Sequence, residues 1–348
     1  LQNEFIAIKV SGEGFDQGRF SIETTGGDPS RDSDDNLPFI YGRPKPWTSY
    51  TTVSVDNVLY GVGTQTVKRA GKKARYGQVA SQIVTQNRIE TLTKLPEVKV
   101  RQSLSFFRNP STQVNDSVLI QYRVYNDSSV TRNVGLRVMM DTMLGSNDAA
   151  PFRIGGAAIQ SETVVTGAAI EDYWQTFDSL ANPTLIGQGL LRYQAAGLTP
   201  PDQLILMNWG SLADELYKPT MVPGRSFIRS GEDEPDTALA LLWEPQPLGP
   251  KMTRHYRTVM GLGGVSLAAG DLSLGLTAPS ELAITDPNHY LVVGYISNTG
   301  GFDVNDAVVH LELPGGLTLV EGTPTIDVGT ILQNGSRQLV WRIGVQPT

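Results

Sequence analysis

The sequence predicts an all-β protein: a large antiparallel β-sandwich followed by a small β-sandwich that lacks its last strand. Apolar and polar residues alternate in a long succession of short segments, which is the period of half-buried strands. Turn-forming residues separate these segments at the spacing typical of antiparallel sandwiches. The composition agrees, because 36 glycines and only 18 % charged residues suit a turn-rich β protein. With 348 residues the chain has room for two domains, which we place at 1–266 and 267–348.

A short strand is predicted at residues 3–10. Its apolar positions are Phe5, Ile6, Ile8 and Val10. A glycine- and aspartate-rich break at 12–18 separates it from a second strand at 19–25, so the first strand is tethered. Two interpretations stay open. The strand pairs at a sheet edge of its own domain, or it is an exchange arm that reaches a neighbouring molecule.

Residues 26–36, GGDPSRDSDDN, form an acidic loop. Asp32, Asp34 and Asn36 place oxygen atoms on alternate residues, as the first three ligands of a calcium loop do. The rest of that motif is missing, because Leu37 stands where the invariant glycine belongs and Arg43 where the bidentate glutamate belongs. The loop is therefore either solvated or a calcium site completed by ligands from elsewhere.

Aromatic and basic residues mark the next segment. Residues 51–60 are predicted to form a hairpin, and Trp47 and Tyr50 precede it or begin it. These two aromatic residues either pack in the core or stack on a sugar ring. The cationic run at 67–75 is either a hairpin tip in water or a partner for the acidic C-terminal region of another copy.

A series of strands follows, at 83–92, 98–107, 117–125 and 133–140, and resumes at 185–193, 203–209, 237–243 and 254–262. No helical pattern separates the strands of the first group, so the sheet is expected to be antiparallel. Only 171–181, EDYWQTFDSLA, has its apolar residues at helical spacing, which predicts a helix over a sheet edge. Trp174 either anchors this helix or lines a carbohydrate groove.

The stretch 132–152 contains the candidate chemistry. A buried strand runs into Asp141, and Asn147 and Asp148 lie in the turn that follows. A carbohydrate-active enzyme needs two carboxyl groups close together, and Asp141 with Asp148 or Glu171 is the pair to test. Asp141, Asn147 and Asp148 are also candidate calcium ligands. An ordinary β-turn has the same appearance.

The second domain is predicted to start after a linker at 267–270. Its strands are expected at 272–277, 290–297, 307–313, 317–320 and 339–345. This spacing is typical of a small immunoglobulin-like sandwich. Such a sandwich normally has one more edge strand after the one that contains Trp341, and none is present, so an open edge is predicted there.

Several chemistries are excluded by composition. The chain has no cysteine, so thiol nucleophiles, disulfides and thiolate metal sites are absent. Only His255, His289 and His310 could serve as a catalytic base, and none stands in a convincing triad pattern. Neither a nucleophile elbow nor a nucleotide-binding glycine motif occurs. We therefore expect no cofactor apart from calcium.

Charge and hydropathy bear on location and partners. The net charge of −7 is concentrated in 267–348, which has eight acids and two arginines. Nucleic acid is thus not an expected partner. No apolar run is long enough to span a membrane. The absence of cysteine is compatible with an extracellular or cell-surface location, reached after removal of a signal peptide.

Two family resemblances add to this picture. The segments GRFSIETTGGDP, YGRPKPWTSYTTVSVDNVLYGVG, GLRVMMDTMLGSNDAAPFRIGG and DYWQTFDSLANPT resemble an uncharacterised family of secreted bacterial proteins. This resemblance covers nearly all of 1–266 and implies a supersandwich similar to the galactose mutarotase fold. Mutarotase activity is not implied, because the matching histidines are missing. Residues 271–348, with NHYLVVGYISNTGG and QLVWRIGV, resemble adhesion-related immunoglobulin-like repeats of bacterial surface proteins.

The function expected from these observations is structural rather than enzymatic. We expect a subunit of a bacterial surface filament, sheath or layer that forms a homopolymer by β-strand complementation. In this mechanism strand 3–10 of one copy completes the open edge beside Trp341 of the next. One alternative is a carbohydrate-binding adhesin module that recognises surface glycans through Trp47, Tyr50 or Trp174. The other is a carbohydrate-active enzyme.

Overall fold

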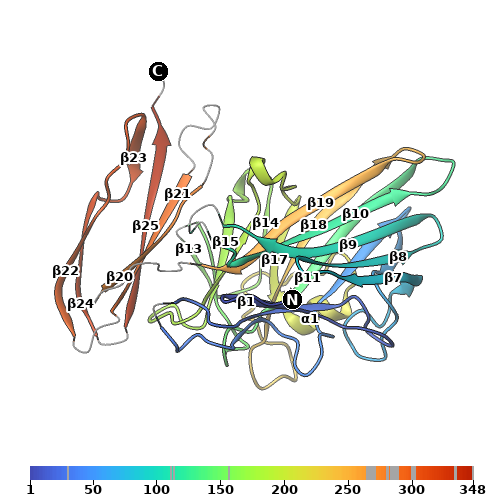
Figure 1. The fold of residues 1–348 in the computed structure, drawn as a ribbon, viewed down its shortest axis with the longest axis horizontal. Helices are drawn as coiled ribbons and strands as arrows, with labels where there is room; N and C mark the ends of the chain where they lie inside the picture. The colour runs from blue at the N-terminus through green and yellow to red at the C-terminus, as the bar shows by residue number, and fades with distance from the viewer. Residues whose placement is uncertain are drawn as a thin grey trace.

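The computed structural model describes residues 1–29, 31–109, 112, 114–155, 157–263, 272–279, 282, 290–298, 303–332 and 335–346. Figure 1 shows a large β-sheet region built by the first part of the chain and a separate, smaller β-sandwich built by the last part. In the described residues helices are limited to α1 (Trp209–Asp214) and the 3₁₀ turns η1 (Gly167–Ala169) and η2 (Gln194–Ala196). The predicted all-β class is confirmed. In the described part of the chain no helix is long and apolar enough to cross a membrane.

Two large sheets form the first region. The nine-stranded sheet has the order β13 (Ala157–Ile159), β12 (Phe152–Ile154), β15 (Tyr173–Phe177), β16 (Ile186–Leu190), β19 (Thr253–Leu262), β10 (Ser117–Asn126), β9 (Val98–Phe107), β8 (Arg88–Lys94) and β7 (Gln78–Val84). The seven-stranded sheet has the order β14 (Thr163–Thr166), β17 (Gln203–Asn208), β18 (Thr237–Leu248), β11 (Arg132–Asp141), β4 (Tyr50–Val55), β5 (Val58–Gly61) and β6 (Arg75–Tyr76). All neighbouring strands are antiparallel except β5 and β6.

The main core lies between these sheets. Alternate residues of β10 point into it, with Ile120 and Val124 as examples, and so do Leu136 and Val138 of β11. Because the side-chain period of a strand is two, the intervening residues face outward. On β11 the outward side is buried too, since Met139 belongs to a second apolar cluster under α1. The predicted strands at 98–107, 117–125 and 133–140 therefore occupy the centre of the fold.

The N-terminal strand belongs to its own domain. β1 (Ile6–Val10) pairs with β2 (Phe20–Thr24), which pairs with β3 (Pro38–Ile40). Phe5, Ile6 and Ile8 are buried in the main core and Val10 packs against it. The predicted exchange arm is therefore wrong, because releasing it would expose these side chains to water.

The predicted helix at 171–181 is also wrong. Residues 173–177 form β15, and all five of its side chains are buried. Trp174 faces the main core, whereas Tyr173 and Phe177 face the C-terminal domain. A strand that is covered on both faces has no apolar–polar alternation, so its pattern was mistaken for a helix. The α-helix of the structure, α1, lies elsewhere and is capped by Asn208, whose side chain accepts from Ser211 N.

The C-terminal part is a sandwich of two sheets. One has the order β20 (Leu272–Thr277), β21 (Tyr290–Asn298), β25 (Ser336–Val345) and β23 (Leu317–Glu321). The other contains β22 (Val304–His310) and β24 (Thr325–Ile331). Trp341 is buried between them, and its strand β25 pairs with a neighbour on each side. The open edge predicted beside Trp341 therefore does not exist. The predicted linker at 267–270 lies outside the described residues, so the domain boundary stays a prediction.

The two parts are in contact through an apolar patch. Tyr173, Phe177 and Ile186 of the nine-stranded sheet pack against Leu291 and Val293 of β21. Inside this contact the Gln175 side chain donates to Tyr295 Oη. Gln338 Nε2 donates to Gln175 Oε1 over 3.0 Å. Gln175, Tyr295 and Gln338 are thus joined by hydrogen bonds inside the contact, whereas the buried Tyr173 hydroxyl has no partner among the described residues.

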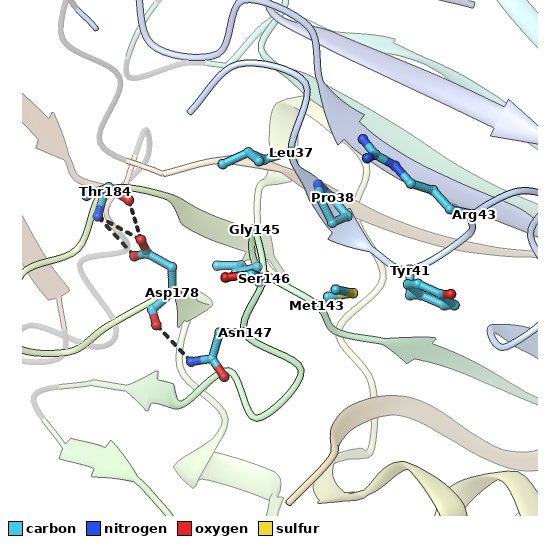
Figure 2. Close-up of a pocket in the computed structure, with 11 residues that line it drawn as sticks. Leu37, Pro38, Tyr41, Arg43, Met143, Gly145, Ser146, Asn147, Asp178 and Thr184 are labelled. Atoms are coloured by element: carbon cyan, nitrogen blue, oxygen red, sulfur yellow. Dashed lines mark hydrogen bonds between the residues drawn. The ribbon is translucent and has the colours of Figure 1, made fainter. Parts of the chain in front are cut away.

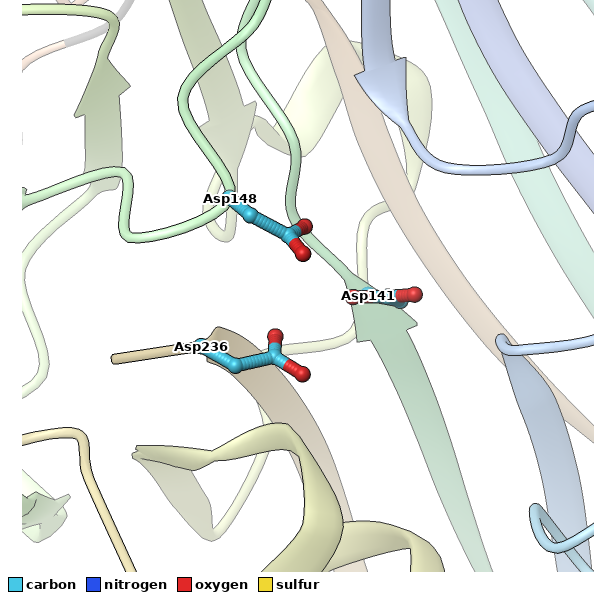
Figure 3. A group of neighbouring side chains, drawn as sticks. All are labelled: Asp141, Asp148 and Asp236. Carbon is cyan, nitrogen blue, oxygen red and sulfur yellow. The ribbon is translucent and has the colours of Figure 1, made fainter. Parts of the chain in front are cut away.

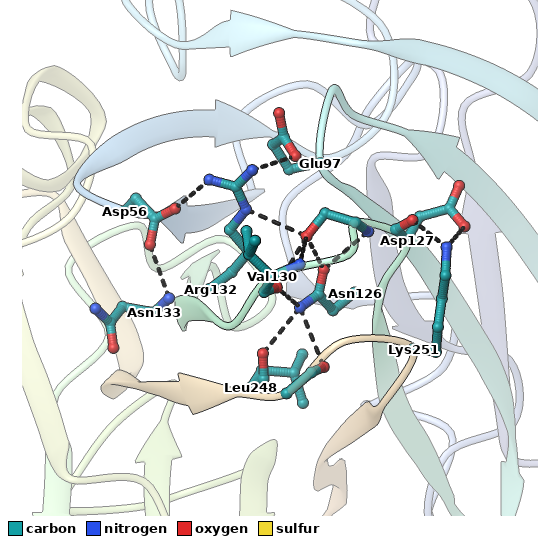
Figure 4. A network of polar contacts seen from close by, with 11 residues as sticks. Asp56, Glu97, Asn126, Asp127, Val130, Arg132, Asn133, Leu248 and Lys251 are labelled. Atoms are coloured by element: carbon teal, nitrogen blue, oxygen red, sulfur yellow. Dashed lines mark hydrogen bonds and ion pairs between the residues drawn. The ribbon is translucent and has the colours of Figure 1, made fainter.

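A polar network joins the turns at one end of both large sheets (Figure 4). Arg132 bridges Asp56 at 3.0 Å and Glu97 at 2.6 Å. Beside it, the buried Asn126 donates to the carbonyl oxygens of Val130, Leu248 and Gly249. One side chain therefore satisfies three backbone carbonyls from two turns.

Replacing Asn126 by alanine should destabilise the protein by about 2 kcal/mol, because buried carbonyl groups lose their donor. Urea denaturation of the variant measures the change in the free energy of unfolding. Ser129→Ala is the matched control at the exposed rim of the same turn and should cost less than about 1 kcal/mol. Equal effects of the two substitutions would contradict the role given to Asn126.

Candidate functional site

Three aspartates converge where β11 and β18 meet. β11 ends at Asp141, which is opposite Ala238 near the start of β18, and Asp236 directly precedes that strand. Antiparallel pairing brings the end of one strand beside the start of the other. One carboxyl oxygen each of Asp141, Asp148 and Asp236 lies within 4.8 Å of the others. Figure 3 shows the three side chains on three separate segments of chain.

The loop after β11 folds back to deliver Asp148. Leu144 and Asn147 form a tight turn with reciprocal backbone hydrogen bonds of 3.0 and 2.9 Å. Gly145 within it has a positive φ of 63°, which glycine adopts without strain. Thr237 N then donates to the carbonyl oxygen of Asp148 over 2.9 Å. The loop is therefore fastened to the start of β18, next to Asp236.

Burial makes this group electrostatically unusual. Asp141 is only 4 % exposed, and its Oδ1 has no hydrogen-bond partner among the described residues. Burial, with the charge of Asp236, raises the pKa of Asp141 well above its ordinary value. Burial and the charge of Asp148 raise the pKa of Asp236 to about 7. The pKa of Asp148 is raised by its own burial and by Glu234.

The ion pairs between described residues include none with these three aspartates, although cations lie nearby. Three carboxylates at this separation repel one another, so the group requires protons or a cation. It is therefore suited either to proton transfer near neutral pH or to metal binding.

A pair of tryptophans adjoins the aspartates. Asp141 N donates to Ser49 Oγ over 2.9 Å, two residues beyond Trp47. Trp209 N donates to the carbonyl oxygen of Asp236 over 3.1 Å. The half-buried rings of Trp47 and Trp209 meet edge to face with 5.8 Å between their centroids. Aromatic side chains and carboxyl groups therefore meet at one place on the surface.

Lysine and arginine lie against these rings. Lys68 Nζ lies 4.7 Å from the centroid of the Trp47 ring, and the Arg69 guanidinium lies 5.5 Å from that of Trp209. Arg69 also forms a bidentate pair with Asp214, at 2.8 and 2.7 Å. The cationic run predicted at 67–75 is thus partly engaged with α1 rather than with another copy.

The sequence identified part of this group. Asp141 and Asp148 were candidates, and the structure brings them together. Glu171 lies elsewhere, where its carboxylate is 3.6 Å from Arg342. Asn147 Nδ2 donates to the carbonyl oxygen of Asp178, and its Oδ1 accepts from Ala149 N. Asp236 was missed, and the one available signal was its place immediately before a predicted strand.

The other sequence candidates differ in accessibility. Tyr50 and Trp174 are buried, so neither can stack on a sugar. Trp47 remains available in part. In the acidic loop Asp34 is buried and accepts from Asp28 N over 2.9 Å, whereas Asp32 is exposed. Asp34 is thus engaged by the backbone of its own loop, and calcium at this loop, with Asn36, stays a prediction.

A pocket of about 370 Å³ lies on the loop between Asp141 and Asp148. Met143, Ser146 and Asn147 of this loop form one side, and Tyr41 and Arg43 contribute to the rest. Figure 2 shows the loop residues beside Asp178, which accepts from Asn147 through its carbonyl group and from Thr184 through its carboxylate. The lining is mainly apolar, since Leu37, Pro38, Met143 and Leu144 contribute to it. The pocket is joined to the Asp141 backbone, because Tyr41 N donates to the carbonyl oxygen of Asp141.

Comparison with known proteins finds similar solved structures but no matching family. No family model matches the sequence, and no curated protein matches it. Among solved structures, a galactose mutarotase related enzyme from Lactobacillus acidophilus is similar over 78 % of this chain and 98 % of its own, with 11 % identity and a TM-score of 0.43. A galactose mutarotase-like protein from Lactobacillus casei is similar over 76 % and 99 %, with 8 % identity and a TM-score of 0.42. A polysaccharide lyase is similar over 99 % of this chain and 46 % of its own, with 8 % identity and a TM-score of 0.36.

The predicted function needs a correction. The similar structures reported above carry the titles of mutarotase-like proteins and a polysaccharide lyase. The prediction of a subunit assembled by strand exchange is wrong, because Phe5, Ile6 and Ile8 of the proposed exchange strand are buried in their own domain. The expectation that the chain is not an enzyme is withdrawn with it. The two family resemblances stay predictions.

The raised pKa of Asp236 predicts a specific dependence of stability on pH. A carboxyl group whose pKa is higher in the folded than in the unfolded state stabilises the fold fully below about pH 4 and progressively less up to about pH 7. Asp236→Asn should therefore raise the free energy of unfolding at pH 8 by about 1–2 kcal/mol, a value reduced for partial exposure, and leave it unchanged at pH 4.

Urea unfolding at both pH values measures this difference. Asp127→Asn is the control of opposite sign, because Lys99 lowers the pKa of the Asp127 carboxyl group. That variant should lose stability at pH 8. A destabilising effect of Asp236→Asn at pH 8 would contradict the electrostatic description of the site.

Proposed function

We propose that this protein is a carbohydrate-active enzyme that cleaves glycosidic bonds with carboxyl groups of the Asp141, Asp148 and Asp236 group. The observation that carries the proposal is the convergence of three carboxyl groups, with raised pKa values, at a partly open surface. Glycoside cleavage requires one carboxyl group to be protonated while its neighbour is ionised. Mutual repulsion within this group supports that division near neutral pH.

Accessibility suggests a role for each residue. Asp236 is partly exposed and has a pKa of about 7, which suits a general acid. Asp148 is the most exposed of the three side chains and suits a nucleophile. The buried Asp141 does not reach a substrate and is a positioning residue. In its protonated form it can donate a hydrogen bond that holds a neighbouring carboxylate.

The close spacing favours a retaining reaction. Retaining enzymes hold their two carboxyl groups about 5 Å apart, whereas inverting enzymes leave room for a water molecule. In the first step Asp148 bonds to the anomeric carbon, the glycosidic bond breaks, and Asp236 gives its proton to the leaving oxygen. In the second step water attacks the anomeric carbon, Asp236 takes back a proton, and the bond to Asp148 breaks.

The tryptophan pair supports sugar binding next to this group. Stacking on an aromatic face suits the apolar face of a sugar ring, and Trp47 and Trp209 are both half-buried beside the aspartates. Lys68 and Arg69 on these rings can donate hydrogen bonds to hydroxyl or carboxylate groups. The substrate would thus be held by aromatic and cationic side chains and cleaved by carboxyl groups.

Asp236→Asn and Asp148→Asn should each lower kcat by about a thousandfold, because each removes a proton donor or a nucleophile. The measurement is release of reducing ends from a panel of polysaccharides and aryl glycosides, with nuclear magnetic resonance of the first-formed anomer. Asp127→Asn, outside the site, should retain activity. Undiminished turnover in both site variants, on a substrate that the wild type cleaves, would refute the assignment.

The second candidate for this group is a divalent cation site, as the sequence suggested with calcium. It is favoured by Asp141 Oδ1 and Asp236 Oδ1, two buried carboxyl oxygens without hydrogen-bond partners among the described residues. Carboxylate oxygens are the ligands that calcium prefers. The cation would replace the protons that the group otherwise holds.

Calcium binding predicts that the melting temperature rises on adding calcium at pH 8, because a ligand of the folded state stabilises it by about 2.7 kcal/mol at a hundredfold excess over Kd. A chelator should reverse the rise, and Asp141→Asn should abolish it. Activity that persists in chelator would favour the acid–base role over the cation. An unchanged melting temperature in both calcium and chelator would reject the cation site.

A further inference from the structure

A row of cationic side chains crosses the outer face of the nine-stranded sheet. Arg101 on β9 lies opposite Arg123 on β10, and Arg123 lies opposite His255 on β19. The inward-facing neighbours on these strands, such as Ile120 and Val124, belong to the core, so the row faces away from it. Neighbouring strands are about 4.8 Å apart, which places three basic side chains within roughly 10 Å.

One acid partly balances this row. Glu90 of β8 is the only acidic residue in strands β7, β8, β9, β10 and β19. Its side chain is 10 % exposed and lies 3.1 Å from Arg101, 3.3 Å from Arg123 and 3.6 Å from Arg88. One negative charge thus faces three arginines. The face retains a net positive charge in a chain whose overall charge is −7.

A fourth arginine adds to the positive charge of this face. Arg257 on β19 lies opposite Gln121, in the row next to Arg123 and His255. With its amide oxygen turned toward Arg257, Gln121 accepts two hydrogen bonds from the guanidinium, at 2.6 and 2.9 Å. Arg257 is therefore held in position by a neutral partner, and its charge is not cancelled.

Such a row has a cost to the fold. Like charges directly opposite each other on adjacent strands are destabilising. Arg123 Nε is also buried without a hydrogen-bond partner among the described residues. Burial, with the charges of Arg257 and Arg123, lowers the pKa of His255. An anionic ligand that paired with these groups would relieve each of these penalties.

The face is long enough for an extended ligand. Lys99 and Phe107 are the first and last outward residues of β9, and eight residues of strand span about 27 Å. Aromatic rings stand at both ends, because Phe107 meets Tyr193 at 6.2 Å and Tyr125 lies beneath Lys99 at 5.8 Å. Cationic residues occupy the middle.

We propose that this face binds an acidic saccharide chain, with uronic acid carboxylates on Arg101, Arg123 and Arg257 and sugar rings against the terminal aromatic residues. A guanidinium pairs with a planar carboxylate through two parallel hydrogen bonds. The overall negative charge of the chain disfavours nucleic acid as the ligand. The inference goes beyond the proposed catalytic function, because it concerns a binding face on the other large sheet and does not require turnover.

The test is calorimetric titration of the full chain carrying Asp148→Asn, which keeps a substrate from being consumed. The probes are a galacturonic acid pentamer, the neutral cellopentaose and inorganic sulfate. The pentamer should bind, cellopentaose should not, and added salt should weaken the binding. Arg257→Gln should weaken it about tenfold, as should the double variant Arg101→Gln/Arg123→Gln.

The matched control is Lys9→Gln/Arg43→Gln, which removes two exposed cations that flank Glu23 as Arg101 and Arg123 flank Glu90. Its affinity should be unchanged. If the double variant misfolds, Arg257→Gln still tests the proposal, because it leaves Glu90 and its partners intact. Equal binding of cellopentaose, equal affinity in Arg257→Gln, displacement by sulfate at equal concentration, or tighter binding of single-stranded DNA would each overturn the proposal.

Discussion

The placement of the candidate site depends on one buried arginine. Arg137 lies on the outward side of β11, fully shielded from water, with its guanidinium 5.0 Å from the centroid of the Tyr50 ring. It donates to the carbonyl oxygens of Leu212 and Glu215, at 3.1 and 2.5 Å. A buried cation without partners is very costly, so the fold tolerates Arg137 only while the end of α1 supplies these oxygens. The helix is therefore fixed on the seven-stranded sheet by the requirement to satisfy this charge.

The same requirement reaches the aspartates. Asn208, which caps α1, also donates to the carbonyl oxygen of Phe227, and Phe227 in turn accepts from Asp236 N over 2.9 Å. Asp236 is thus linked to the helix at both its backbone groups, since its own carbonyl accepts from Trp209 N. Three carboxyl groups that repel one another stay together only if the surrounding backbone is held rigidly in place. A rigid frame of this kind can hold a group that is unfavourable by itself.

The sequence predicted features that depend on neighbouring residues, and it did not predict contacts between segments that are distant in the chain. The alternation at 133–140 correctly predicted a central strand. Its position before a polar turn indicated Asp141 and Asp148, which the structure places close together. Asp236 could not be found in this way, because its place beside Asp141 follows from the register between β11 and β18. The sequence of one strand alone does not determine its register with a strand that is distant in the chain. The error at 173–177 has a similar origin, since burial by the C-terminal domain removed the alternation that marks a strand. The strand at 3–10 was interpreted as an exchange arm because a flexible segment connects it to the next strand. The burial of Ile6 and Ile8 shows that its apolar side chains hold it in its own domain.

The contact between the two sandwiches has a consequence for how the chain can be divided. Tyr173, Phe177 and Ile186 are covered only when Leu291 and Val293 are present, and Gln175 has its buried partner in Tyr295. A fragment cut at residue 266 would present these side chains to solvent as an apolar patch around the Gln175 amide, which would keep only Gln188 as its partner. Such a fragment is expected to aggregate and to be poorly soluble, although its two large sheets are complete. The two sandwiches therefore fold as one unit, although the large sandwich has a complete set of strands by itself. Recombinant work on either large sheet needs both sandwiches in one polypeptide.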